Sequence, residues 1–163
     1  MTKEILESFS FPFFMTSEEL FRHAESGTDY LISQRPFACV GTLKATFDSG
    51  DVRRWLFDQE GNIVAVAIDE DDGMWFKWVS ESLDMDGDIV AYAGLDFEFA
   101  YEDTGTFSDL EGDTGLEEDE PFSLTEYEAE SGEVLRIVVQ EASGSKQIFF
   151  GKSLPLKEIQ ETE

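Results

Sequence analysis

Three aspartates, Asp84, Asp86 and Asp88, have the spacing of the first, third and fifth ligands of a calcium-binding loop. Such a loop needs glycine at its sixth position and a bidentate glutamate at its twelfth, where this chain has Ile89 and Leu95. We therefore predict that these aspartates form an exposed acidic turn. Because the chain also has a single cysteine, we expect neither a metal site nor a cofactor.

Nucleophilic catalysis has equally few candidate residues. His23 is the only histidine and lies beside Arg22 on a predicted helix, whereas serine and cysteine nucleophiles need a histidine within hydrogen-bonding reach. Cys39 stands between two apolar residues in a predicted strand, which favours a small core side chain over a reactive thiol. No glycine-rich phosphate loop ends in Lys-Ser or Lys-Thr. We predict no catalytic residues and a protein that is not an enzyme.

Charge is the strongest feature of the composition. The 163 residues include 37 acidic and 11 basic ones, for a formal net charge of −26. No lysine or arginine occurs between Lys77 and Arg136, whereas aspartate and glutamate recur throughout that interval. Such a field repels nucleic acid and anionic lipid, because binding to either needs cations on the protein. We predict no nucleic-acid partner and no membrane insertion.

The acidic run Glu117, Glu118, Asp119 and Glu120 is the candidate partner-binding segment. Runs of like charge usually form exposed loops, and a basic protein surface would relieve their mutual repulsion. One interpretation is a non-enzymatic interaction module that binds another protein, for which a basic partner would suit. The alternative is a charge-mimicking inhibitor, either an immunity-type protein or a DNA mimic. Acidity that only keeps the protein soluble is the third interpretation.

The elements that position these residues are predicted to be strands. From Phe37 to Ser80, turns containing Gly50 and Gly61 separate runs of β-branched and aromatic residues, as in an antiparallel meander. We predict one mainly β domain over residues 1–163. Its parts would be an extended segment and a short helix in 1–36, a first meander in 37–101, and an acidic loop with a second meander in 102–159. The two meander halves would form a barrel or a sandwich, and the tail from Glu158 would fray.

A capping-box pattern marks the predicted N-terminal helix. Thr16 can cap the helix and Glu19 follows three residues later, which favours a helix at about residues 17–25. Leu20, Phe21 and Ala24 would then face the core.

Side-chain alternation predicts which strand residues are buried. Phe76 and Trp78 share one face of their strand, opposite Lys77, and we place both aromatic residues in the core. The continuously apolar run from Ile63 to Ile68 predicts a strand that is covered on both faces or lies centrally in its sheet.

Two predicted hairpins resemble each other. Aligning Gly61 with Gly132 sets residues 63–66 over residues 134–137, both of which are rich in isoleucine and valine. This match is typical of a duplicated meander but also of hairpins in general, and both explanations stay open.

Several short motifs occur in a suggestive order. They are Gly41-Thr42-Leu43, Trp55-Leu56-Phe57, Glu60-Gly61 and Met74-Trp75-Phe76, followed by a closing stretch from Glu126-Tyr127 through Phe150-Gly151-Lys152-Ser153-Leu154 to Glu158-Ile159. Over roughly residues 37–159 this order resembles a bacterial family named domain of unknown function 4178. The middle acidic segment and the lack of a tryptophan in the second half depart from the family pattern. The resemblance implies a β-rich cytoplasmic bacterial domain and supplies no functional residues.

The sequence also bears on cellular location. The chain does not start with a charged and then apolar leader, and no apolar run approaches the length of a membrane span. Together with the single cysteine, this predicts a soluble, cytoplasmic protein. The sequence does not indicate an oligomeric state.

Overall fold

The computed structural model describes residues 14–68, 70, 72–81, 83, 87–118 and 120–162. In these residues the chain forms one helix and twelve strands. The elements are α2 (Ser17–His23), β1 (Thr28–Ile32), β2 (Arg35–Cys39), β3 (Gly41–Phe47), β4 (Val52–Phe57), β5 (Asn62–Val66), β6 (Asp72–Trp78), β7 (Ile89–Tyr92), β8 (Leu95–Gly112), β9 (Pro121–Ala129), β10 (Val134–Gln140), β11 (Ser145–Pro155) and β12 (Gln160–Thr162). None of the helical residues in the described part forms a segment long and apolar enough to cross a membrane.

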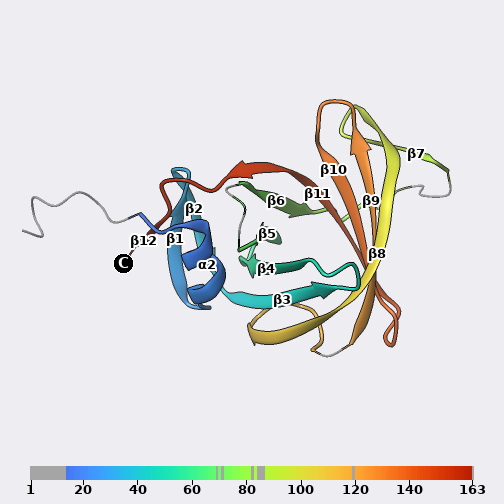
Figure 1. The fold of residues 1–163 in the computed structure, drawn as a ribbon. Helices are drawn as coiled ribbons and strands as arrows, with labels where there is room; N and C mark the ends of the chain where they lie inside the picture. Colours follow the sequence, from blue (N-terminus) through green and yellow to red (C-terminus); the bar gives the residue numbers. More distant parts are fainter. Residues whose placement is uncertain are drawn as a thin grey trace, which may run out of the picture.

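Eight of the strands form a closed antiparallel barrel, so the predicted mainly β fold is confirmed and the barrel is the form it takes. The order around the barrel is β3-β4-β5-β6-β11-β10-β9-β8, and pairing of β3 with β8 closes the ring. β7 continues the sheet beyond β8. Figure 1 shows β8, β9 and β10 rising past the barrel at one side, with β7 beside them.

The barrel consists of two four-stranded meanders, β3–β6 and β8–β11. They meet at the antiparallel pairs β6–β11 and β3–β8. Gly61 and Gly132, the two glycines that the sequence comparison aligned, occupy corresponding hairpin turns and have φ values of 87° and 101°. Positive φ favours glycine in tight turns, so hairpin geometry alone also accounts for this match.

The N-terminal unit packs on the outer face of the first meander. It combines α2 with a small sheet of order β12-β1-β2, which lies beside the barrel in Figure 1. The predicted capping box is present, with Glu19 N donating to Thr16 Oγ1 over 3.0 Å. The helix ends at His23, earlier than predicted, because Ala24 adopts an extended backbone. Leu20, Phe21 and Ala24 are buried, as predicted.

β5 is covered on both faces, which confirms the prediction from its continuously apolar sequence. Ile63 and Ala65 point into the barrel core, whereas Val64 and Val66 belong to the core shared with the N-terminal unit. Seven aromatic residues belong to the barrel core, and the rings of Phe107 and Phe122 stack with centroids 4.2 Å apart.

The prediction that Trp78 lies in the core is wrong. Phe76 is 2% exposed in the barrel core, as predicted, but Trp78 is 50% exposed. The predicted facing is right, since both side chains project from the same face of β6. Trp78 nevertheless lies at the end of the strand, where its side chain rests over Gly61 and the barrel opens to solvent.

Two segments predicted to be irregular are strands. The prediction of an acidic loop from residue 102 is wrong as far as Gly112, because β8 continues to that residue. It pairs with β9 up to Thr106 and with β3 from Gly105 to Gly112. The tail does not fray, because β12 pairs with β1. In both cases pairing partners distant in the sequence provide the hydrogen bonds. The extended segment predicted for the first residues lies mostly outside the described part.

Candidate functional site

A cavity of about 660 Å³ opens at one end of the barrel, and we call it the mouth cavity. It lies where the β3–β4 turn, the start of β6, the middle of β8 and the end of β11 come together. Its apolar and basic lining includes Phe47, Arg53, Ala65, Met74, Tyr101 and Arg136, and its acidic lining includes Asp51, Glu70, Asp72, Glu102 and Asp103.

Strand alternation explains why these side chains face the cavity. Arg53 precedes the core residue Trp55 by two positions, and Arg136 lies between the core residues Val134 and Val138. Both arginines therefore project from the inner face of the barrel. Small barrels of eight strands are wide enough either to fill with side chains or to hold one small ligand. In this barrel, core side chains fill much of the interior, and the mouth cavity lies at one end.

Arg53 is held by two carboxylates. Its Nε donates to Asp51 over 2.8 Å, and its Nη1 and Nη2 donate to the two oxygens of Glu70 over 2.7 and 3.5 Å. Burial alone would lower the pKa of Arg53, but the bonds and charges of Glu70 and Asp51 outweigh burial and raise it. Each guanidinium nitrogen thus already has a carboxylate acceptor.

Arg136 lies deeper and pairs with Glu126, its direct cross-strand partner on β9. The two side chains are 12% and 8% exposed. Nε and Nη2 of Arg136 both donate to Glu126 Oε1, over 3.1 and 2.7 Å. The guanidinium carbon also lies 4.5 Å from the centroid of the Phe76 ring, a cation–π contact.

Tyr101 completes this end of the barrel. It pairs across β8 and β9 with Glu126, on the other side of Glu126 from Arg136. Burial raises the pKa of Tyr101, while the charge of Arg136 acts in the opposite direction. The phenol therefore stays protonated at neutral pH and can donate a hydrogen bond.

The lining of the mouth cavity is acidic overall, with five carboxylates and two guanidiniums. Because both guanidiniums already have carboxylate partners, the remaining field in the cavity is negative. Phe47, Ala65 and Met74 add apolar surface. The arrangement suits a positively charged group on an apolar stem.

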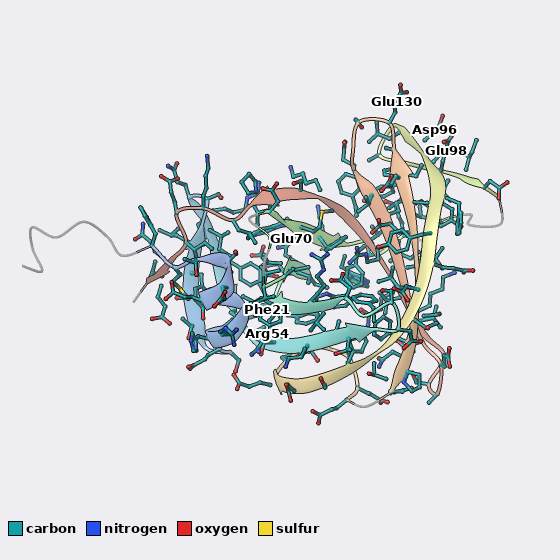
Figure 2. All side chains as sticks on the ribbon, viewed as in Figure 1. Phe21, Arg54, Glu70, Asp96, Glu98 and Glu130 are labelled. Carbon is teal, nitrogen blue, oxygen red and sulfur yellow. The ribbon has the colours of Figure 1, made fainter. Side chains whose placement is uncertain are left out.

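An acidic groove adjoins the cavity along the part of β8 and β9 that extends past the barrel. It has a volume of about 680 Å³, and its carboxylates are Asp96, Glu98, Glu128 and Glu130. Figure 2 shows Asp96, Glu98 and Glu130 gathered at the far end of these strands. Glu98 and Glu128 are directly opposite in the strand register, an arrangement of like charges that destabilises a sheet.

The groove and the cavity share one face of β9. Glu126 and Glu128 alternate along that strand, so their side chains point to the same side, and Glu130 follows in the turn after it. A ligand that occupies the mouth cavity can therefore continue along the groove.

The acidic run that the sequence suggested as the partner-binding segment lies elsewhere. β8 pairs with β3 from Gly105, beside Phe47, to Gly112, beside Gly41, so the segment after Gly112 lies at the barrel end away from the cavity. Glu117 and Glu118 are exposed there. Asp119 falls outside the described residues.

Glu120 is the exception in that run, because it is only 8% exposed. Its Oε1 accepts a hydrogen bond of 2.9 Å from the backbone N of Ser143. A hydrogen bond and charge repulsion from Glu120 raise the pKa of Glu117. Glu120 therefore stabilises a turn and is not available to a partner.

The other residues considered for chemistry are accounted for as follows. His23 is exposed on α2, and Cys39 is 2% exposed in the core between barrel and N-terminal unit. Burial raises the pKa of the Cys39 thiol to about 11, which makes it unreactive. Asp84 and Asp86 fall outside the described residues. In the part of the chain that is described, no three His, Cys, Asp or Glu side chains are arranged to hold a metal ion.

The sequence contains one signal that could have located the cavity. Arg136 interrupts an otherwise apolar strand at an inward-facing position, and a charged residue in such a place needs a partner. Its partner Glu126 belongs to the same hairpin, but the opening beside it depends on which distant strands become neighbours.

Comparison with known proteins adds no identification: no protein-family model, no curated protein and no solved structure matches this chain. The resemblance to the domain of unknown function 4178 stays a prediction.

Proposed function

We propose that this protein is an interaction module that binds a positively charged segment of another protein in the mouth cavity and along the acidic groove. The observation that carries the proposal is the imbalance of charge in a concave site: Asp51 and Glu70 pair with Arg53 and Glu126 pairs with Arg136, which leaves three lining carboxylates, Asp72, Glu102 and Asp103, without a cationic partner among the described residues. No catalytic step is proposed, and binding needs no cofactor.

Lysine and arginine side chains fit this site in two ways. Their alkyl stems can lie against Phe47, Ala65 and Met74, while their charged ends reach the carboxylates at the rim. The opposed pair Glu98 and Glu128 would gain from a nearby cation, because bound positive charge removes their repulsion.

Titration with two short peptides tests the proposal. One alternates lysine with serine, and the other has glutamate in place of each lysine. We expect saturable binding of the lysine peptide alone, followed by intrinsic tryptophan fluorescence or calorimetry. Affinity should fall as salt is added, since exposed charges are screened beyond about 8 Å at physiological ionic strength.

A pair of charge-matched variants locates the site. Asp72→Asn with Glu102→Gln removes two exposed cavity carboxylates, whereas Asp29→Asn with Glu60→Gln removes two exposed carboxylates outside it. We expect the first variant to weaken binding of the lysine peptide and the second to leave it nearly unchanged. Equal effects of the two variants would contradict a site in the cavity.

The alternative function is a charge-mimicking inhibitor of a basic protein. It is supported by the exposed carboxylates of Glu117 and Glu118 and by the net charge of −26. Such an inhibitor uses its surface charge as a whole, so the cavity variant and its matched control would weaken binding alike.

A further inference from the structure

The two arginines of the mouth cavity differ in how fully their donors are used. Arg53 donates from all three nitrogens to Asp51 and Glu70. Arg136 donates only from Nε and Nη2, and only to one oxygen of Glu126. In the described part of the chain, no carboxylate accepts a hydrogen bond from Nη1 of Arg136; its other side-chain neighbour is the hydroxyl of Tyr101.

Arg136 therefore keeps one edge of its guanidinium open. A guanidinium can bind carboxylates in a bidentate manner along the Nε–Nη2 edge and along the Nη1–Nη2 edge. Glu126 occupies the first edge. No carboxylate of the described residues occupies the second edge, which lies beside the Tyr101 hydroxyl.

This open edge belongs to the floor of the cavity. Arg136 lines the cavity and also borders the packed layer beneath it, together with Trp55, Phe76 and Phe149. The gap in that layer has no room for a water molecule. A ligand that enters the barrel therefore stops at Arg136.

Other donors at this level also have no acceptor. The hydroxyl of Tyr101 lies within hydrogen-bonding reach of Arg136, which can only donate to it, so no described residue accepts its O–H, and Tyr101 lines the same cavity. In the packed layer beneath, Trp55 is 2% exposed and its indole N–H also has no partner among the described residues. The floor thus offers donors, whereas the rim offers carboxylate acceptors.

We propose that the cavity binds the C-terminal end of a basic protein segment, with the terminal carboxylate on Arg136 and Tyr101 and the cationic side chains at the rim. This inference rests on the proposed function. A lone anion would be repelled by the rim, where Asp72 and Glu102 lie, but an anion attached to cations would not. Capture of a terminal carboxylate by converging donors is a known mode of peptide recognition.

Two forms of the lysine–serine peptide test the inference, one with a free C-terminal carboxylate and one with a C-terminal amide. We expect the amide to bind the parent protein about tenfold more weakly, a loss typical of one charge-assisted hydrogen bond. Tyr101→Phe should reduce the difference between the two forms. Arg136→Lys keeps the charge but loses the open guanidinium edge, and it should nearly abolish the difference.

The variant Asp72→Asn with Glu102→Gln separates this inference from the proposed function. It should weaken both peptide forms by the same factor, because it changes only the rim. If acid and amide bind the parent equally well, capture of the C-terminus is wrong and the proposed function stands. If neither form binds, both are wrong. Because Tyr101 is partly exposed, Tyr101→Phe tests the inference even if Arg136→Lys fails to fold.

Discussion

The ring of Phe76 lies over the backbone of Gly151, its direct partner across the β6–β11 pair. A Cβ atom at Gly151 would collide with the ring carbons of Phe76. The glycine therefore leaves the space that the ring needs to fill the barrel. This contact lies where the two meanders join, so it bears directly on closure of the barrel.

Replacing this glycine should be costly. We expect Gly151→Ala to lower the free energy of unfolding by about 1–3 kcal/mol, the usual cost of overpacking a filled core. The midpoint of urea denaturation measures the change. Lys152→Ala, at an exposed position of the same strand, is the control and should change stability by less than about 0.5 kcal/mol. Equal midpoints for both variants would show that Phe76 can move away.

Phe76 and Trp78 should respond very differently to truncation. Phe76→Ala removes a ring that is 2% exposed, and we expect a loss of roughly 3–5 kcal/mol. Trp78→Ala removes a side chain that is 50% exposed, so its cost should be about 1 kcal/mol or less. Denaturation in urea compares the two variants. A loss for Trp78→Ala as large as that for Phe76→Ala would mean that this end of the barrel is closed in solution.

Substitutions of Arg136 and Glu126 should have strongly non-additive effects on the free energy of unfolding, because the two side chains form a buried ion pair. Arg136→Met leaves the carboxylate of Glu126 buried without a partner, and we expect it to cost about 3–5 kcal/mol. Adding Glu126→Met removes the stranded charge, so the double variant should recover much of that stability. A double-mutant cycle from denaturation curves gives the coupling free energy. If the double variant were less stable than Arg136→Met, the pair would not be a buried ion pair.

Glu111 should make the attachment of the N-terminal unit sensitive to acid. Its Oε1 accepts hydrogen bonds from the backbone N and the Oγ of Ser26, over 2.9 and 3.0 Å, and these bonds lower the pKa of Glu111 below 4.5. A carboxyl whose pKa is lower in the folded state stabilises the fold above its unfolded pKa. That contribution is lost as the pH falls through the folded pKa.

Comparing the parent with Glu111→Gln tests this pH dependence. The variant should be less stable than the parent near neutral pH, and the difference should shrink as the solution is acidified below about 4.5. Denaturation midpoints over that pH range measure the difference. If the difference in stability between parent and variant were unchanged or larger in acid, the Glu111 carboxylate would not stabilise the fold through its hydrogen bonds to Ser26.

The sequence predicts the local features of this fold well, because local rules govern them. The capping box at Thr16 and the two-sided burial of β5 follow from residue types within a few positions. The exposure of Trp78 does not follow, because strand alternation gives the face of a side chain but not its height along a barrel.

The candidate site depends on pairings between distant strands. Glu126 and Arg136 are neighbours within one hairpin, but Arg53, Glu70 and Tyr101 reach the same cavity only after the barrel closes. The second half of β8 is predicted to be a loop for the same reason, since its partner β3 lies far away in the chain. The sequence shows acidic residues that are next to one another, such as Glu117 and Glu118, but not carboxylates that come together only in the fold.

Closure of the barrel by distant strands also has a consequence for folding kinetics. β3 must find β8, β6 must find β11 and β1 must find β12 before these pairs are stable. Folds dominated by such non-local pairs take milliseconds to seconds, and meanwhile each separate meander exposes strand edges that can join other chains. A net charge of −26 makes incomplete chains repel one another during that time. The acidity of this sequence therefore protects the protein while it folds.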